Sequence, residues 1–179
     1  MASESVIQQV NYAYKLEEIS RGFDATEKQL NTAIRRACGK LARWMKAQAL
    51  RELAQETGIK PSKLKSRVRS ASKTKEGLPV GRVWIGGSSV SFRSLGPKKA
   101  KGGAKAGGIF KKNAFQVNHR NEQWFQRVGS DRLPIKKITV DIMAPAMRVI
   151  RADIAPEAEK KFFEIFEREI RWETTRNLT

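Results

Sequence analysis

The stretch Asp24–Gly58, DATEKQLNTAIRRACGKLARWMKAQALRELAQETG, carries the longest regular pattern in this chain of 179 residues. Apolar residues recur there every three or four positions, which predicts one long amphipathic helix. Asp24 and Glu27 fit a capping box at its start, while Gly58 and the following Pro61 fit its end. Such a helix spans about 50 Å, so the other elements must be arranged along it.

The apolar stripe of this helix is expected to face the core of its own subunit, with a face for a neighbouring subunit as the alternative. Gly39, in the middle of the helix, either weakens it slightly or permits another backbone to approach closely. The opposite face is basic and carries Lys28, Arg35, Arg36, Lys40, Arg43, Lys46 and Arg51.

Short β-rich segments follow the helix. Their spacing and turn residues predict an antiparallel meander, with strands over Ser66–Thr74, Leu78–Ile85 and Ser89–Arg93. Three later strands are expected, and Pro134 places the start of the last one at a sheet edge; they cover Ala114–Val117, Gln123–Val128 and Leu133–Val140. The pattern becomes helical from Ala144, and Pro156 fits the start of a final helix.

These patterns predict an α+β fold, in which a long N-terminal amphipathic helix packs on a small antiparallel β-sheet and a C-terminal helix closes the domain. Residues 1–22 are expected to form an N-terminal arm, with a poor helical pattern over residues 1–20, and residues 23–179 a single domain. The final helix is acidic opposite its apolar face. The acidic face of the final helix could therefore meet the basic face of the long helix, within the subunit or between copies.

The net charge of +18 is confined to the middle of the chain. Residues 35–112 hold 21 lysines and arginines and three acids, whereas the remaining residues hold 15 of each sign. A charge this localised indicates a polyanionic partner, and nucleic acid is the commonest one; acidic proteins or a membrane surface are the alternatives.

The stretch Ser94–Asn113, SLGPKKAKGGAKAGGIFKKN, is the most basic part of this section, with six lysines, five glycines and no acid. Its composition predicts a mobile, positive loop that projects from the folded body between two strands. A disordered, solubilising insertion is the alternative. The residues expected to face DNA or another polyanion are Arg67, Arg69, Lys98, Lys99, Lys101, Lys105, Lys111 and Lys112.

Residues for catalysis are sparse. His119 and Cys38 are the only histidine and cysteine, so one chain cannot assemble a four-ligand zinc site from these residue types. Asp131 and Asp141 lie near strands and offer weak support for a metal-dependent nuclease. We therefore expect no enzyme, no metal and no cofactor. Aromatic residues near the charge are expected mainly in the core, with stacking on bases as the alternative: Trp84, Phe92, Phe110 and Phe115.

No stretch of 18 consecutive apolar residues occurs in the chain, so no transmembrane span and no membrane partner are expected.

The segments GGIFKKNAFQV (107–117) and QWFQRVGSDRLPIKKITVDI (123–142) form a distinctive series. Together with the long basic helix and GIKPSKLKSRVR (58–69) before them, they resemble the phage minor tail protein Z family, the tail completion proteins of long-tailed phages and prophages. The similarity covers roughly Asp24 to Trp172, and the order of the parts carries it. The positions that carry the pattern, which we expect to specify the fold, are Arg127, Gly129, Arg132, Leu133 and Pro134.

The resemblance implies a structural virion protein of the tail or neck, assembled in the host cytoplasm. It would complete the head-proximal end of the tail and help to join it to the phage head around the DNA path. The implied partners are further copies in a ring, by analogy a hexamer, the tail terminator and head–tail connector, and double-stranded DNA. The alternative is a free, non-specific DNA-binding protein with a condensing or regulatory role.

Overall fold

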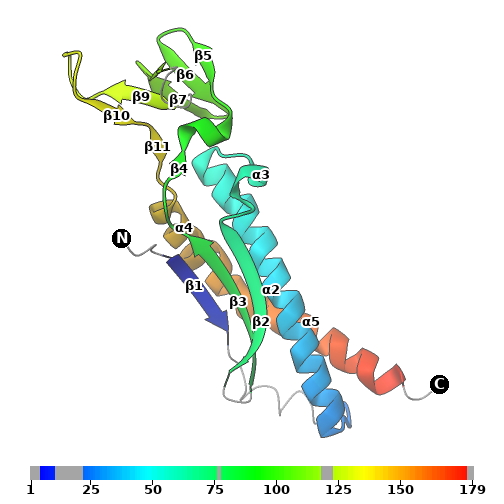
Figure 1. Ribbon diagram of the computed structural model, residues 1–179. Coiled ribbons are helices and arrows are strands. Elements are labelled where there is room, and N and C mark those ends of the chain that lie inside the picture. Colours follow the sequence, from blue (N-terminus) through cyan, green and yellow to red (C-terminus); the bar gives the residue numbers. More distant parts are fainter. Residues whose placement is uncertain (1–4, 11–21, 76–77, 118–122, 177–179) are drawn as a thin grey trace.

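A computed structural model describes residues 5–10, 22–75, 78–117 and 123–176. Figure 1 shows an elongated molecule in which long helices and one sheet form a body, and several short strands gather at one end. We call this end the β-lobe and define it as residues 92–138. The expected α+β class is confirmed: helices and small antiparallel sheets combine, and a helix lies at the C-terminal end.

Helix α2 (Glu27–Thr57) follows the predicted stretch. Its N-cap is Thr26, whose side chain accepts a hydrogen bond from the Gln29 backbone, while the Gln29 side chain accepts one from the Thr26 backbone. The predicted capping box of Asp24 and Glu27 is therefore wrong by two residues. The predicted end is confirmed, because Gly58 adopts a left-handed conformation with φ of 67° and donates to the Ala54 carbonyl at 3.0 Å.

The apolar face of α2 lies in the core of the same subunit, as expected. It is rich in small side chains, which lets neighbouring elements approach closely; its buried residues are Ala33, Ile34, Ala37, Cys38, Leu41, Ala42, Met45, Ala49 and Leu53. Close approach does not occur at Gly39, where a Cβ atom would meet nothing within 4 Å. It occurs at Gly81, where a Cβ atom would lie 2.8 Å from the Cys38 carbonyl oxygen.

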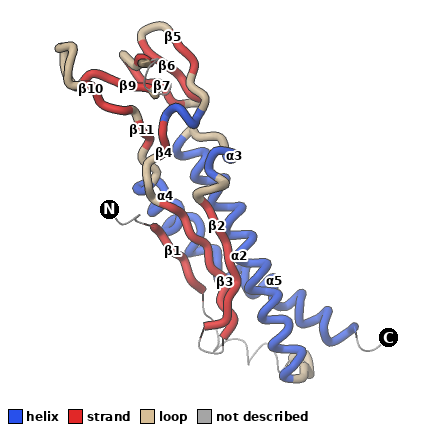
Figure 2. Tube along the Cα trace, in the orientation of Figure 1, coloured by secondary structure: helices blue, strands red, loops and turns tan. Residues whose placement is uncertain are grey.

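A three-stranded antiparallel sheet has the order β1-β3-β2 (Figure 2), and its strands β2 and β3 cover one face of α2. Strands β2 (Val68–Lys75) and β3 (Leu78–Gly86) form the predicted hairpin, joined to α2 through the short α3 (Pro61–Leu64). The third strand is β1 (Ser5–Val10), which pairs with β3. The helical pattern expected over residues 1–20 is therefore wrong for Ser5–Val10.

Two consecutive helices pack along another side of α2. Helix α4 (Met143–Val149) continues through a π-helical segment, η2 (Ile150–Ile154), into α5 (Ala155–Thr175). Helical structure thus begins at Met143, and Pro156 lies in the first turn of α5. The apolar face of α5 is buried and contributes Ala158, Phe162, Ile165, Phe166 and Ile170 to the core.

The β-lobe is joined to the body by β4 (Val90–Ser91), which pairs with β11 (Thr139–Val140). The predicted strand Ser89–Arg93 is thus shorter than expected, because the 3₁₀ helix η1 (Phe92–Leu95) follows at once. Two three-stranded antiparallel sheets make up the lobe. The first contains β5 (Lys98–Ala100), β6 (Gly103–Ala106) and β7 (Ile109–Lys112). The second contains β8 (Phe115–Gln116), β9 (Trp124–Arg127) and β10 (Ile135–Lys137).

The two predictions for the chain around the β-lobe have different outcomes. The β8–β9 pairing agrees with the hairpin predicted from Ala114 to Val128, although its turn lies outside the described residues. The single strand predicted over Leu133–Val140 is divided into β10 and β11, with the buried Ile138 between them. As predicted from Pro134, β10 is an edge strand.

Candidate nucleic-acid interface

The lysine- and glycine-rich stretch Ser94–Asn113 contains the end of η1 and the three strands β5, β6 and β7, so the prediction of a loop is wrong. Its glycines serve defined backbone geometry. Gly102 and Gly107 occupy the two turns with φ of 77° and 59°, a region that favours glycine. At Gly103 a Cβ atom would lie 2.1 Å from the Lys111 carbonyl oxygen, so β6 and β7 pair there only without a side chain. The high glycine content, from which we predicted flexibility, instead permits tight turns and close pairing of strands.

The strand register gives this sheet one basic outer face. Lys98, Lys105 and Phe110 are directly paired across the three strands, and Lys112 lies opposite Gly103 in the next row. The three lysines are exposed, and Phe110 is 49% exposed. Because successive residues of a strand point to opposite faces, the intervening Ala104 and Ala106 point inward and are buried.

The inner face packs on a small core that belongs to the lobe itself. Phe92 and Trp124 meet edge to face at 6.1 Å between ring centroids, and Ile138 completes the cluster with Ala104 and Ala106. Phe92 is fully buried, so the expected core role is confirmed for it, whereas Phe110 faces solvent. The lobe therefore holds its basic face on a fixed support.

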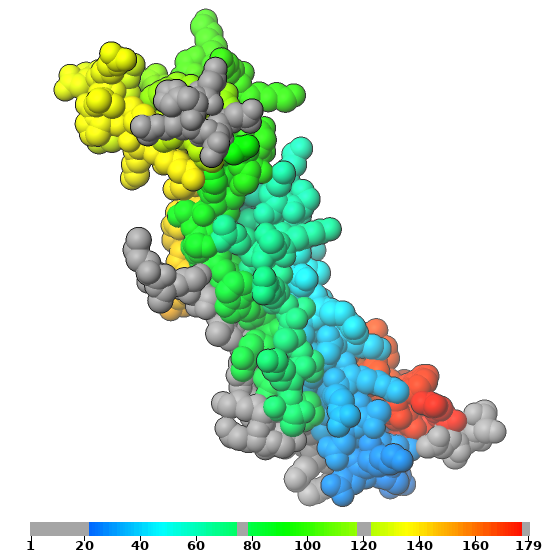
Figure 3. Space-filling model, viewed as in Figure 1, coloured from blue at the N-terminus to red at the C-terminus, as the bar shows by residue number. Residues whose placement is uncertain are grey.

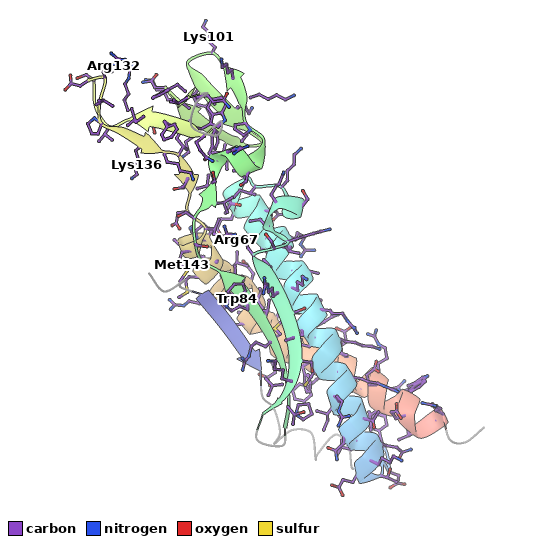
Figure 4. The ribbon with its side chains drawn as sticks, in the orientation of Figure 1. Arg67, Trp84, Lys101, Arg132, Lys136 and Met143 are labelled. Carbon is purple, nitrogen blue, oxygen red and sulfur yellow. The ribbon has the colours of Figure 1, made fainter. Side chains whose placement is uncertain are left out.

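The β-lobe is strongly positive. Its described residues, 92–117 and 123–138, include eleven lysines and arginines and one acid, Asp131. No described residue forms an ion pair with any of the six lysines that the sequence singled out: Lys98, Lys99, Lys101, Lys105, Lys111 and Lys112. Figure 4 shows Lys101, in the β5–β6 turn, extending from the far end of the molecule. Unpaired cations that remain hydrated are available to an external anion.

The basic face of α2 has a different environment. Arg36 forms an ion pair with Glu173, and Lys40 forms one with Glu169, both glutamates lying on α5. These two carboxylates are buried, with 6% and 8% of Glu169 and Glu173 exposed. The predicted complementarity of the basic and acidic helices is thus realised within one subunit. Part of the positive charge of α2 is therefore neutralised by acidic residues of the same subunit.

Arg67 and Arg69 lie on the body, and the structure does not bring them together with the lysines of the lobe. Arg67 donates a hydrogen bond of 3.2 Å to the Ser88 carbonyl, and the Arg69 guanidinium lies 5.8 Å from the centroid of the Trp84 ring. Figure 4 places Arg67 and Trp84 along the sheet, well separated from Lys101. The predicted site is therefore two regions, of which the lobe is the more strongly charged.

The residues of the family-like pattern lie in and beside the hairpin that joins β9 to β10. Arg127, Gly129, Arg132, Leu133 and Pro134 are all exposed, and in Figures 3 and 4 this hairpin stands out to one side. Pro134 has a local structural role, since its carbonyl accepts a hydrogen bond from the Val128 backbone at 3.1 Å. Leu133 buries little, with 67% of it exposed.

The sequence reading missed Lys136 and Lys137 as members of the site. Both are exposed on β10 and lie beside Lys111 and Arg127 in a cleft of the lobe. The signal was present in the series LPIKKITV, where two adjacent lysines interrupt an edge strand. Only the pairing of β10 with β9 shows which neighbours they have.

Candidates for catalysis have structural roles or stand alone. The Asp141 carboxylate accepts a hydrogen bond from the Met143 backbone at 3.0 Å, at the start of α4, and Asp131 is exposed. Burial raises the pKa of the Cys38 thiol to about 11. Over the described residues, no group of three or more His, Cys, Asp or Glu side chains is placed to hold a metal ion. His119 lies outside them.

Comparison with protein-family models, curated proteins and solved structures gives no match. Within the part of the chain that the structure describes, no helix has both the length and the apolar character needed to cross a membrane.

Proposed function

We propose that this protein is a structural component of the tail or neck of a long-tailed phage, with the β-lobe turned toward DNA or an acidic neighbour. The observation that supports this proposal best is the separation of charge. The body pairs basic residues of α2 with buried acids of α5, whereas the described residues of the lobe, 92–117 and 123–138, include eleven cations and a single acid. A surface of this kind attracts a polyanion through its phosphates and permits sliding.

In this proposal the protein completes the head-proximal end of the tail and acts without enzymatic chemistry or a cofactor. Copies form a ring, for which six is the expected number, between the tail terminator and the head–tail connector. The body then provides the rigid, elongated part, and the lobe provides the DNA-proximal part. The resemblance of residues 107–142 to tail completion proteins supports the placement, and the charge of the lobe supports the DNA contact.

A variant in which Lys98, Lys99, Lys101 and Lys105 are all changed to Ala tests the role of the lobe. All four side chains are exposed, so we expect normal folding by circular dichroism. Phage assembled with this variant should show impaired tail joining or impaired DNA retention. Wild-type infectivity would contradict a role for these lysines.

A free DNA-binding protein with a condensing or regulatory role is the second candidate, because the same unpaired lysines of the lobe would support it. It would bind duplex DNA in solution with a steep salt dependence and would be absent from mature particles.

A further inference from the structure

A cleft of about 410 Å³ lies where β7 meets the β9–β10 pair. Four cations line it, Lys111, Arg127, Lys136 and Lys137, and the other described residues of its lining are neutral. None of these four side chains forms an ion pair with any residue in the described ranges. Four positive charges around one depression repel each other, and an anion in the cleft would relieve that repulsion.

Backbone and side-chain hydrogen bonds hold the walls of this cleft. The Gln126 side chain donates to the Lys112 carbonyl at 3.0 Å and so ties β9 to the end of β7. Ile138, in the floor, donates to the Trp124 carbonyl at 2.9 Å and accepts from the Phe92 backbone at 3.1 Å. Phe92 and Trp124 belong to the core of the lobe. These hydrogen bonds therefore connect the strands that carry the cations to that core.

A second depression of about 410 Å³ shares Gln126 and Arg127 with this cleft. The described residues that line it include no lysine, and they add Asn113, Phe115 and Ser130. The Arg127 guanidinium lies 5.8 Å from the centroid of the Phe115 ring, at the border of the two depressions. One depression therefore offers positive charge, and its neighbour offers an amide, a hydroxyl and an aromatic ring.

We propose that the cleft is the main phosphate-binding site of the lobe and that a nucleic-acid strand passes from it into the neighbouring depression. A strand alternates phosphate with sugar and base, which fits the paired depressions better than a free phosphate does. The inference rests on the proposed function for the presence of DNA beside the lobe. It assigns close backbone contact to the cleft, while the outer lysines Lys98 and Lys105 supply attraction at longer range.

Three double variants that each remove two positive charges test this assignment. Lys136→Ala with Lys137→Ala alters the cleft, and Lys98→Ala with Lys105→Ala alters the outer face. Lys28→Ala with Arg35→Ala alters exposed positions of α2 in the body. Binding of a fluorescent 20-base-pair duplex is measured by anisotropy between about 50 and 200 mM salt, the range over which phosphate contacts change affinity strongly.

The cleft variant should bind at least about tenfold more weakly at about 0.1 M salt, with the slope of log K against log salt reduced by about two, one per lost phosphate contact. Each of the other variants should lose less than about threefold, as expected for charges that only steer. Equal losses in the cleft and outer-face variants would overturn the assignment, as would an unchanged cleft variant.

Inorganic tripolyphosphate, used as a competitor, separates a nucleic-acid strand from a free phosphate chain. We expect it to displace the duplex only weakly, since it cannot occupy the neighbouring depression. Tighter binding of tripolyphosphate than of duplex would overturn the assignment to nucleic acid. If the protein is absent from phage particles but its cleft variant still loses DNA binding, the proposed function is refuted and the cleft assignment stands. If the protein is present in particles but the cleft and outer-face variants lose DNA binding equally, the cleft assignment is refuted and the proposed function stands.

Discussion

Lys98 and Lys105 lie directly opposite each other on β5 and β6, with both side chains exposed. Like charges in this position destabilise a strand pair, typically by a few tenths of a kcal/mol to about 1 kcal/mol. Repulsion between these lysines therefore lowers the stability of the β-lobe on the same face that we propose attracts a polyanion.

Replacing one of this pair should separate stability from binding. In Lys98→Glu the new carboxylate faces Lys105, so we expect the free energy of unfolding to rise by up to about 1 kcal/mol, measured by urea denaturation. Affinity for duplex DNA should fall at the same time, because two units of positive charge are lost. Lys98→Gln serves as the control and should lie between wild type and Lys98→Glu in both measurements. Tighter DNA binding by Lys98→Glu would contradict the role of this face.

Gly39 on α2 and Gly81 on β3 should respond to alanine in opposite directions. Gly39 has open space around its missing Cβ, so Gly39→Ala should stabilise the protein by about 0.5–1 kcal/mol through helix propensity. In Gly81→Ala the Cβ would meet the Cys38 carbonyl oxygen at 2.8 Å, and the resulting displacement should cost about 1–3 kcal/mol. Thermal denaturation of the two variants checks both signs. A stabilised Gly81→Ala variant would show that β3 does not pack on α2 as described.

The ion pair of Lys40 on α2 and Glu169 on α5 should stabilise the fold more than the exposed pair of Lys161 and Glu164 within α5. Glu169 is 6% exposed, so Lys40→Ala leaves a buried carboxylate without its cation and should cost about 1–3 kcal/mol. Lys161→Ala is the control. Its partner Glu164 is exposed, and no measurable loss of stability is expected. Comparable losses in both variants, measured by urea denaturation, would count against internal neutralisation of α2.

Cys38 should make stability fall at alkaline pH. Burial raises the pKa of its thiol from the usual 9.0 to about 11, opposed in part by a backbone hydrogen bond with Gly81. Below pH 9 both folded and unfolded states keep the thiol proton. Between pH 9 and 11 the unfolded state loses it while the folded state retains it, so stability falls as pH rises through this window, by about 2–3 kcal/mol in total.

The matched variant for this effect is Cys38→Ala, which cannot titrate at this position. Its stability relative to wild type should improve steadily from pH 9 to 11 in urea denaturation. In native protein at pH 8, a disulfide reagent should label Cys38 slowly, and urea should accelerate the labelling. Rapid labelling of the native protein would contradict the buried position of the thiol.

The body of this molecule could be predicted from local patterns. The three- and four-residue spacing of apolar residues and the stop at Gly58 were sufficient for α2, and alternation was sufficient for the β2–β3 hairpin. The pairing of β1 with β3 could not be predicted in this way, because its contacts span more than seventy positions of the chain.

The β-lobe shows the limit of composition as a guide. Lysine and glycine in Ser94–Asn113 indicated a mobile loop, since charge and glycine both oppose packing. What composition does not express is position. Gly102 and Gly107 fall at turns that need positive φ, and Ala104 and Ala106 fall at alternate positions that face the Phe92–Trp124 core. The cleft around Lys136 depends on which strands are neighbours in the fold, and local sequence patterns do not determine these neighbours.

The composition of purified particles tests most directly whether the protein is part of the virion, as we propose. Particles from the phage or induced prophage that encodes this chain are purified, treated with nuclease and analysed by quantitative mass spectrometry against the major tail protein. We expect a fixed, low copy number per particle, near six. Absence from particles, or a trace amount that varies between preparations, would contradict the proposal.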